Sequence, residues 1–255
     1  MKEVVWGIMD KNFKIIVEYD GTNFFGWQRQ NDKKTIQGEI EKALRMILNQ
    51  DIKISGSGRT DAGVHAFGQV ATFKADTGIP PQNIKKGVNS LIKQPIVIRD
   101  CHIMEDAFHA RYNAVSKEYH YFILNREDPC AIGRSYQWHI RHPLDIEVMN
   151  QCCNEITGVF DFKSFENTGS PRSSTVREIF FSHVSSLDNN RLVFKICASG
   201  FLRYMVRNLI GTIVLAGLNK ITVPEFKKIL EAKDRTKAGP TAPAHGLFLK
   251  KVNYS

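Results

Sequence analysis

The sequence predicts an α+β (or α/β) fold in which the sheets are mainly antiparallel. Segments rich in β-branched and aromatic residues alternate with segments whose apolar residues recur at helical spacing. The gaps between them have the length of hairpins and short loops, which is typical of antiparallel sheets combined with helices. The 255 residues are 42% apolar and 24% charged, so the chain can bury one large core or two smaller ones.

The first half of the chain begins with a predicted strand at 12–19, which a turn at 20–23 follows. Thr35 is a suitable N-cap for a helix that extends to about Asn49, because the apolar residues after it form one stripe at helical spacing. A second helix is expected to begin near the Pro80-Pro81 pair and to end around Leu91. Further strands are expected at 52–55, 67–73, 96–104, 108–114 and 117–125.

The second half repeats this alternation of helices and strands. Helices are predicted at 145–157, 201–218 and 223–232, and strands at 176–185, 191–198 and 247–252. The change from one set to the other lies near residues 113–116. We therefore place a domain boundary there, which divides the chain into residues 1–114 and 115–255.

The composition excludes several classes of protein. Lys and Arg number 35 against 26 Asp and Glu, a formal net charge of +9, which suits an RNA partner and equally a merely basic surface. No apolar run approaches the roughly 20 residues that a membrane-spanning helix needs, and the N-terminus does not resemble a signal peptide. The five cysteines form no C-x-x-C pair, as is typical of reduced thiols. We expect a cytoplasmic protein that uses neither a membrane nor a metal.

The strongest candidate for a catalytic segment is 56–66, Gly-Ser-Gly-Arg-Thr-Asp-Ala-Gly-Val-His-Ala. In an extended chain Arg59 and Asp61 point to the same side, and a guanidinium beside a carboxylate keeps the acid ionised. Such an aspartate can serve as a nucleophile or a base. A phosphate-binding G-x-G-x-x-G loop would need glycine at position 61, where a carboxylate would repel phosphate. For a random loop, a surface turn with an exposed Arg–Asp pair is the better interpretation, since such pairs are common and contribute little, and the spacing alone does not decide.

The residues 58–66, followed by Gly-Gln-Val-Ala-Thr-Phe at 68–73, resemble the signature of the tRNA pseudouridine synthase A (TruA) family. The resemblance extends from about Phe13 to Tyr254. It implies two ferredoxin-like halves whose sheets join around a central RNA-binding cleft. It also implies that Asp61 is the catalytic residue and that Arg59 enters the RNA stem as the target base leaves the stack.

Two further catalytic residues are inferred from the second half. Tyr119 and Tyr121 share one face of a predicted strand, and half-buried core tyrosines would give the same pattern. The resemblance implies that Tyr119 stacks on the target uracil. Arg203 and Arg207, four residues apart, would lie at the edge of an apolar helix face, where an arginine needs a partner or access to water. The Met-Val-Arg-Asn segment resembles that of the family, in which the arginine corresponding to Arg207 pairs with the aspartate.

Other residues are expected to contact the substrate. The loop Phe-Phe-Gly-Trp-Gln-Arg-Gln at 24–30 resembles a family segment that forms a wall of the active site, which assigns Trp27, Gln28 and Arg29 to substrate binding; alternatively, its aromatic residues pack into the core. Arg203 is expected to reach water or an RNA phosphate. The remaining candidates are His65 in the signature and Arg111 in the Phe-His-Ala-Arg segment at 108–111. His65, His109 and His245 are interpreted as structural or RNA-contacting residues, because none has a ligand-like partner at helical spacing.

By resemblance, the protein is an isomerase that converts uridine to pseudouridine at positions 38 to 40 of the tRNA anticodon stem-loop. It is expected to be a homodimer that holds one tRNA across both subunits, and an isomerisation of this kind requires no redox cofactor, nucleotide or metal. One alternative is the same chemistry on another RNA, since the segments 90–96 and 133–136 depart from the family pattern. A non-catalytic RNA-binding protein is a weaker alternative, because it leaves Asp61, Tyr119 and Arg207 unexplained.

Overall fold

The fold is a mixture of helices and mostly antiparallel strands, which confirms the predicted class. This computed structural model describes residues 10–167, 169 and 173–255. The absence of a signal peptide was predicted from N-terminal residues that lie outside the described part. The chain divides into two compact units. The first ends at Ala114 and also includes Ser255, and the second is Val115–Tyr254. Each unit is described separately.

The first unit contains one sheet and two helices in the order β-α-β-β-α-β. The strands lie in the order β4-β1-β3, and β2 pairs with β3. Strand β1 is antiparallel to β3 and β4, and β2 is antiparallel to β3. This connectivity and order are those of a ferredoxin-like unit. The elements are β1 (Lys11–Tyr19), α1 (Ile36–Leu48), β2 (Ser55–Gly56), β3 (His65–Ala75), α2 (Pro81–Leu91) and β4 (Ile96–Met104).

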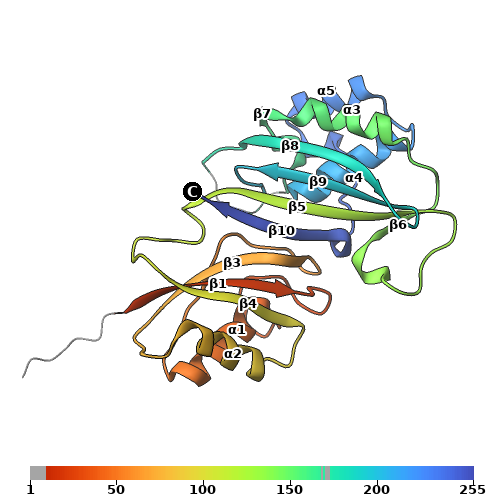
Figure 1. The fold of residues 1–255 in the computed structure, drawn as a ribbon. Coiled ribbons are helices and arrows are strands. Elements are labelled where there is room, and N and C mark those ends of the chain that lie inside the picture. The colour runs from red at the N-terminus through yellow and green to blue at the C-terminus, as the bar shows by residue number, and fades with distance from the viewer. Residues whose placement is uncertain (1–9, 168, 170–172) are drawn as a thin grey trace, which may run out of the picture. The chain divides into compact units, whose positions relative to one another are not determined.

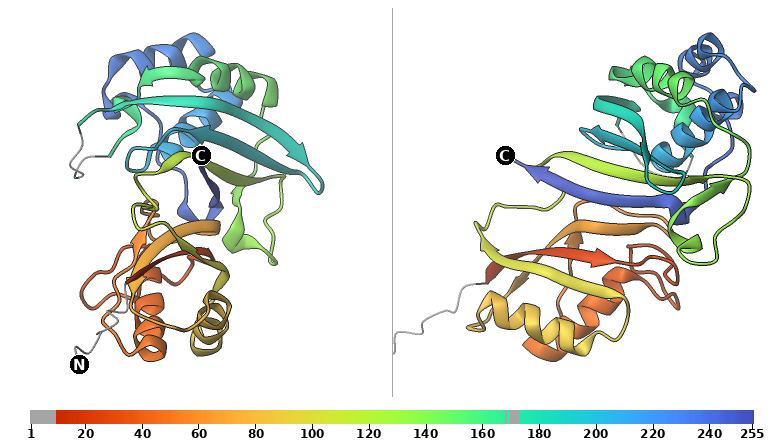
Figure 2. Two further views of the ribbon diagram at one scale, coloured as in Figure 1. Left: turned by 60° about the vertical axis from the view of Figure 1, so that its left-hand side comes forward. Right: turned by 45° about the vertical axis from the view of Figure 1, so that its right-hand side comes forward.

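Both helices of the first unit lie on one face of its sheet (Figure 1), and the two views in Figure 2 agree. Thr35 caps α1 as predicted, because its side chain accepts a hydrogen bond from the backbone N–H of Gly38. On β1, alternate residues point into the core. Phe13 stacks on Phe73, the residue opposite it on β3, with ring centroids 5.0 Å apart. Aromatic pairs of this kind stabilise antiparallel sheets.

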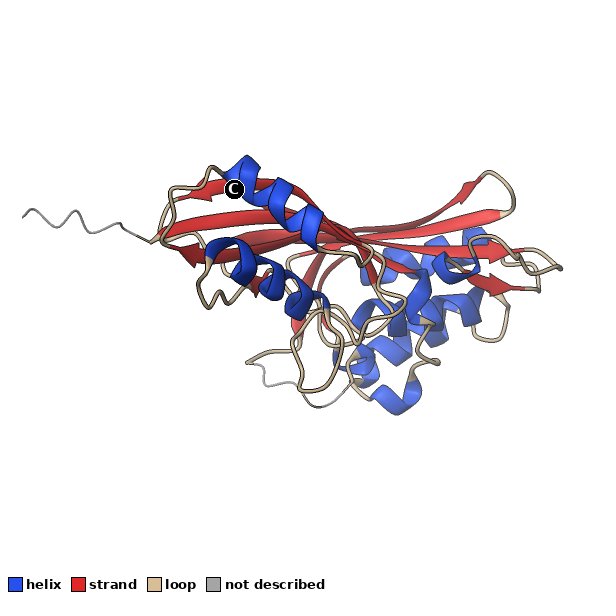
Figure 3. Ribbon diagram, turned by 90° about the horizontal axis from the view of Figure 1, so that it is seen from below, coloured by secondary structure: helices blue, strands red, loops and turns tan. Residues whose placement is uncertain are grey.

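The second unit has a similar plan with additions at its edges. Its strands lie in the order β10-β5-β9-β8-β7, and β6 pairs in parallel with β5. Its helices and strands are distinguished by colour in Figure 3. Helix α3 packs on β8 and on α4 and α5. The elements are β5 (Ala114–Asn125), β6 (Trp138–Ile140), α3 (Ile146–Ile156), β7 (Gly158–Asp161), β8 (Val176–Leu187), β9 (Arg191–Ala198), α4 (Met205–Gly217), α5 (Val223–Ala232) and β10 (Leu247–Tyr254).

The predicted strand at 108–114 is wrong, because only Ala114 belongs to a strand and residues 110–112 form a turn. The ring nitrogen Nδ1 of His109 accepts hydrogen bonds from the backbone N–H groups of Arg111 and Tyr112, at 3.0 and 3.4 Å. The Asn113 side chain accepts one from the N–H of His109 at 2.8 Å. These local bonds use backbone donors that a strand would offer to its neighbour, so the turn replaces the strand.

The predicted start of the long helix at residue 201 is also wrong. Helix α4 begins at Met205, because Tyr204 has φ +64° and therefore lies in the left-handed region. A helix cannot continue through a residue in this conformation. Arg203 accordingly precedes the helix, and it does not share a helix face with Arg207. Two short strands, β6 and β7, were not predicted, and the segment expected as a strand at 52–55 is reduced to Ser55–Gly56.

Candidate active site

Asp61 lies in the first unit, in the loop that joins β2 to β3. Exposure alternates along this loop: Arg59 is exposed, Thr60 is 6% exposed, and Asp61 is half-buried. Neighbouring residues of an extended segment point to opposite sides. The alternation therefore fits the prediction that Arg59 and Asp61 share the outer side while Thr60 points inward.

Thr60 anchors the loop to the core from the inner side. Its hydroxyl lies 2.8 Å from the hydroxyl of Tyr19, and its carbonyl accepts a hydrogen bond from the backbone N–H of Trp27 at 3.1 Å. Tyr19 is 3% exposed, and burial raises the pKa of its phenol above the ordinary value. The phenol is thus protonated over the physiological pH range, so the hydrogen bond to Thr60 does not depend on pH there.

The start of the loop is held by the buried side chain of Gln69 on β3. Gln69 Oε1 accepts hydrogen bonds from the Ser57 hydroxyl at 2.7 Å and from the N–H of Val70 at 3.1 Å. Gln69 Nε2 donates to the carbonyl of Gly58 at 3.0 Å. Ser57 and Gln69 are both 0% exposed, so the two bonds that Gln69 Oε1 accepts are shielded from water, and the bond to Gly58 is partly buried. This buried network fixes the backbone two residues before Thr60.

Two glycines allow the chain to approach the Asp61 loop closely. Gly26 has φ +84°, and a Cβ there would lie 2.6 Å from the carbonyl oxygen of Thr60. A Cβ on Gly21 would lie 2.0 Å from the carbonyl oxygen of Val64. Only glycine leaves room for two backbones at these separations. The segment 21–27 consequently packs directly against the loop on both sides of Asp61.

Trp27 and His65, two of the residues expected to contact the substrate, are both buried in the first unit. Trp27 is 2% exposed and lies beneath Gly56, where a Cβ would come within 2.6 Å of the indole nitrogen. His65 is 1% exposed, and its Nδ1 accepts a hydrogen bond from the N–H of Gly21 at 3.1 Å. Both side chains support the loop from inside. For Trp27, the alternative that loop aromatic residues pack into the core describes the structure.

The structure brings Arg59 and Gln28 together, since Arg59 Nε donates to Gln28 Oε1 at 3.0 Å in an exposed contact. Arg29 is placed differently from the other candidates. Its guanidinium pairs with Glu41 at 3.2 Å, and the side chain of Glu41 is only 3% exposed. A buried carboxylate requires such a partner. Arg29 therefore has a structural role in addition to the expected contact with substrate.

In the second unit, Tyr119 and Tyr121 lie on β5 and are both buried, at 8% and 0% exposure. The ring of Tyr119 meets the ring of Phe201 edge to face, with centroids 5.1 Å apart. The Tyr121 hydroxyl donates to the carbonyl of Pro243 at 2.8 Å. Burial raises the pKa of Tyr121, and the positive charge of Arg207 opposes this effect only in part. Tyr121 is therefore a neutral hydrogen-bond donor that holds the C-terminal segment.

Arg207 lies in the first turn of α4 and is tied to the segment that precedes β10. Its Nε donates to the carbonyl of Ala242 at 2.7 Å, and the N–H of Ala242 donates to the carbonyl of Arg207 at 3.1 Å. These two hydrogen bonds hold the Arg207 side chain in a fixed direction. A Cβ on Gly211, one turn later, would lie 1.9 Å from the carbonyl oxygen of Pro240. The segment 240–242 thus packs directly against α4.

Arg203 and Arg207 meet at the ring of Tyr204. The guanidinium carbons lie 5.3 and 4.8 Å from the ring centroid, within the range of a cation–π interaction. Arg203 is also close to Gly169, where a Cβ would lie 2.8 Å from its Nη1. Tyr204 is an aromatic residue in the left-handed region, which costs about 1–3 kcal/mol. The sequence pattern gave no indication of a role for this residue.

A polar network behind Arg207 was also missed. Asn208 is 0% exposed, and its Nδ2 donates to the carbonyl of Phe165 and to Asn167. Its Oδ1 accepts from Arg235 at 3.1 Å and from Thr241 at 2.6 Å. Arg235 also donates to Asn167, Thr241 and the carbonyls of residues 238 and 239. The sequence feature that could have indicated this network is the asparagine directly after Arg207 in an apolar helix.

Arg111 lies in the first unit, in the turn that replaces the predicted strand. It is exposed, and its guanidinium carbon is 5.8 Å from the ring centroid of Tyr112. The ring of Tyr112 is 77% exposed and rests on His109, with centroids 4.4 Å apart. An exposed aromatic ring beside an arginine is a combination that nucleic-acid-binding surfaces use.

His245 has a pKa below its ordinary value of 6.5, chiefly because of burial, with the nearby charge of Arg207 contributing. Below pH 6.5 the unfolded chain binds a proton at this site that the folded chain does not, so the free energy of unfolding falls as the pH falls. We expect wild type to lose more stability than His245→Gln between pH 7.5 and pH 5.5. Urea midpoints at both pH values measure this, and equal losses in the two proteins would contradict it.

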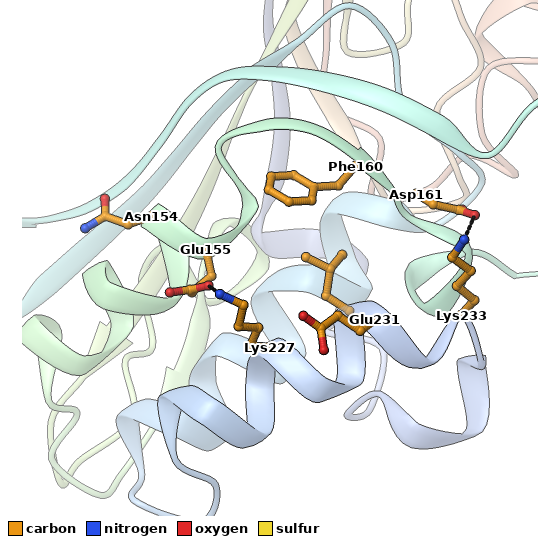
Figure 4. Close-up of a pocket in the computed structure, with 8 residues that line it drawn as sticks. Asn154, Glu155, Phe160, Asp161, Lys227, Glu231 and Lys233 are labelled. Carbon is orange, nitrogen blue, oxygen red and sulfur yellow. Dashed lines mark ion pairs between the residues drawn. The ribbon is translucent and has the colours of Figure 1, made fainter.

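A pocket of about 230 Å³ lies between α3, β7 and α5 of the second unit (Figure 4). Two ion pairs lie at its rim, Lys227 with Glu155 at 3.1 Å and Lys233 with Asp161 at 3.2 Å. None of the predicted site residues lines it. Among the described residues, no three His, Cys, Asp or Glu side chains are grouped as metal ligands, and no helix is long and apolar enough to cross a membrane.

Comparisons with known proteins point to one family. The sequence model described as tRNA pseudouridine synthase matches residues 15–113 and 152–255. Relatives named tRNA pseudouridine synthase A from Thermoanaerobacter sp. strain X514 and tRNA pseudouridine synthase A 2 from Clostridium perfringens strain 13 are 42% and 40% identical. Each alignment spans 244 residues, 96% of this chain and 100% of the relative. The solved "Structure of H/ACA RNP bound to a substrate RNA containing 2′-deoxyuridine" shares 14% identity over 80% of this chain and 52% of that one, with a TM-score of 0.34.

Proposed function

Because the chain belongs to the tRNA pseudouridine synthase family, we propose that it isomerises uridine to pseudouridine at positions 38 to 40 of the tRNA anticodon stem-loop. The observation that carries the proposal is Asp61 with its surrounding signature, in a chain similar to tRNA pseudouridine synthases over nearly its whole length. Asp61 stands half-buried on a loop whose inner side is bonded to the core. Such a carboxylate is positioned in advance of the reaction.

In the proposed reaction the N1–C1′ glycosidic bond of uridine breaks, the uracil rotates, and a bond forms between C5 and C1′. The hydrogen on C5 leaves as a proton, and N1 gains one, so the reaction is an isomerisation. Asp61 is the proposed catalytic residue, whether it attacks the sugar or the base or abstracts the 2′ proton, since an ionised carboxylate serves each route. We assign Tyr119 to holding the uracil and Arg207 to keeping Asp61 anionic and oriented.

The remaining residues are proposed to bind the RNA. A target base has to leave its stack before it can reach a catalytic group. We propose that Arg59, held by Gln28, occupies the stem when this happens, and that Arg29, Arg111 and Arg203 contact phosphates. Four of these five residues are arginines, and the net charge of +9 favours a polyanionic partner. For Trp27 and His65, burial favours a supporting role beneath the loop.

The remaining proposals concern assembly, compartment and substrate choice, and each is supported by the resemblance of the sequence to its family. The enzyme is proposed to act in the cytoplasm as a homodimer that holds one tRNA across both subunits. Of the proposed catalytic residues, Asp61 lies in the unit that ends at Ala114, and Tyr119 and Arg207 lie in the other unit. A second candidate is the same chemistry on another RNA, and the departure of residues 90–96 from the family pattern favours it.

The proposal is tested by tritium release from tRNA labelled with [5-³H]uridine. C5 loses its hydrogen only if it becomes the new glycosidic carbon, so release reports this isomerisation directly. We expect release from a tRNA transcript with uridines at positions 38 to 40 and none when these are cytidines. Release from both transcripts would contradict the assigned positions. No release from bulk tRNA, with release from another cellular RNA, would favour the second candidate.

A further inference from the structure

The N-terminus of α4 is built on a residue that is unusual for its backbone conformation. Tyr204 has φ +64° and ψ 2°, and its side chain makes no capping hydrogen bond. Its carbonyl accepts the N–H of Asn208 at 2.9 Å, so the helix starts from this residue. Glycine and asparagine adopt this conformation readily, whereas an aromatic residue does not. The backbone alone therefore gives no reason for a tyrosine at this position.

The ring of Tyr204 provides a reason. Its centroid is 4.8 Å from the guanidinium carbon of Arg207 and 5.3 Å from that of Arg203. A flat ring attracts a guanidinium placed over its face and restricts the directions in which the planar group can turn. Glycine or asparagine would relieve the backbone and would leave both arginines without this surface.

The contacts of Arg207 show what the ring adds. The hydrogen bond from its Nε to the carbonyl of Ala242, at 2.7 Å, holds one edge of the guanidinium. A hydrogen bond at one edge does not by itself fix the tilt of the plane. The ring of Tyr204 supplies a further, independent restraint on the plane. Together they define the direction in which the remaining N–H donors of Arg207 point.

We infer that Tyr204 is a positioning residue, whose ring orients the guanidinium of Arg207 for its role beside the catalytic carboxylate. This inference rests on the proposed function, since it deepens the role assigned to Arg207. The strained backbone at Tyr204 is the consequence of placing a ring, rather than a hydrogen atom or an amide, at the start of α4. Strain of this kind is found where structure serves function.

Four proteins separate the ring from the backbone: wild type, Tyr204→Phe, Tyr204→Asn and Tyr204→Ala. Phenylalanine keeps the ring, asparagine loses it but suits the left-handed region, and alanine has neither advantage. We expect the single-turnover rate of tritium release at saturating tRNA to remain within about threefold of wild type for Tyr204→Phe and to fall about tenfold for both Tyr204→Asn and Tyr204→Ala. The thermal midpoint of Tyr204→Asn should exceed that of Tyr204→Ala by about 2 °C.

A spectroscopic measurement follows the guanidinium itself. In protein labelled with ¹⁵N at arginine Nε, the resonance of Arg207 is assigned by its loss in Arg207→Lys. A proton held over a ring face is shifted upfield. The Hε proton resonance of Arg207 should therefore be upfield in wild type and Tyr204→Phe, and it should move downfield in Tyr204→Asn and Tyr204→Ala. This shift does not depend on catalysis.

The outcomes separate the positioning role from the proposed function. A wild-type rate in Tyr204→Asn, or an Arg207 resonance that is the same in all four proteins, would overturn the inference. Activity that followed the thermal midpoint rather than the ring would assign Tyr204 a purely structural role and would also overturn it. If wild type released tritium from no RNA, the proposed function would fail, and the Arg207 resonance would still decide whether the ring holds the guanidinium.

Discussion

Replacing Asp61 with asparagine should abolish tritium release from labelled tRNA, lowering the single-turnover rate by at least about 10³-fold. Asparagine has nearly the shape of aspartate, so the loop should retain the bonds of its neighbours, including the Thr60–Tyr19 contact at 2.8 Å. The substitution removes the negative charge and replaces one carboxylate oxygen with an amide NH₂ group. Binding of tRNA should remain within about threefold of wild type, because removing a negative charge does not weaken attraction to a polyanion.

A matched control for this substitution is Asp51→Asn. Asp51 has a side chain that is 67% exposed and pairs with Arg45 at the surface, so its neutralisation changes the net charge by the same amount. Exposed pairs contribute about 0–1 kcal/mol, and we expect both activity and stability to be unchanged. Wild-type activity in Asp61→Asn would refute the assignment of the catalytic residue. Loss of activity in both variants would mean that charge, rather than Asp61 itself, is responsible.

The second large effect is expected from Gly211→Ala. The added Cβ would lie 1.9 Å from the carbonyl oxygen of Pro240 and 3.2 Å from the N of Ala242. Both obstructing atoms belong to the backbone, so the segment 240–242 has to move away from α4. Because Ala242 holds Arg207 through two hydrogen bonds, the guanidinium should lose its direction. We expect a loss of at least about 2 kcal/mol in the free energy of unfolding, together with a fall in the rate of tritium release.

Gly217→Ala is the control on the same helix. A Cβ there would meet the side chain of Met149, at 2.7 Å from its Cγ and 2.8 Å from its sulfur. A methionine side chain can shift to accommodate a methyl group, and alanine is the better helix former. We expect a change of less than about 1 kcal/mol and normal activity. Thermal melts and tritium release on both variants measure the effects, and equal behaviour would show that contact with segment 240–242 is unimportant.

Elements with local signals were predicted well from the sequence. Helix α5, Val223–Ala232, and strand β9, Arg191–Ala198, have the predicted bounds. In α5, Thr222 and Glu225 form a capping box, and the apolar spacing continues until the helix ends. Such signals lie within a few residues of the element that they define. Where local side-chain bonds compete with a strand, as at His109 and Asn113, the same reasoning failed.

The sequence by itself determined the family and the mixture of helices and antiparallel strands, and it singled out Asp61 as the candidate catalytic residue, because a signature and a hydrophobic period can be read along the chain. Only the tertiary structure decided that Trp27 is buried beneath Gly56, and that Arg235 joins Asn167 and Asn208. It also decided the left-handed turn at Tyr204. The first two depend on contacts between residues 27 to 68 positions apart, which no local pattern encodes. A tyrosine has no intrinsic preference for φ +64°, so its surroundings have to impose that conformation.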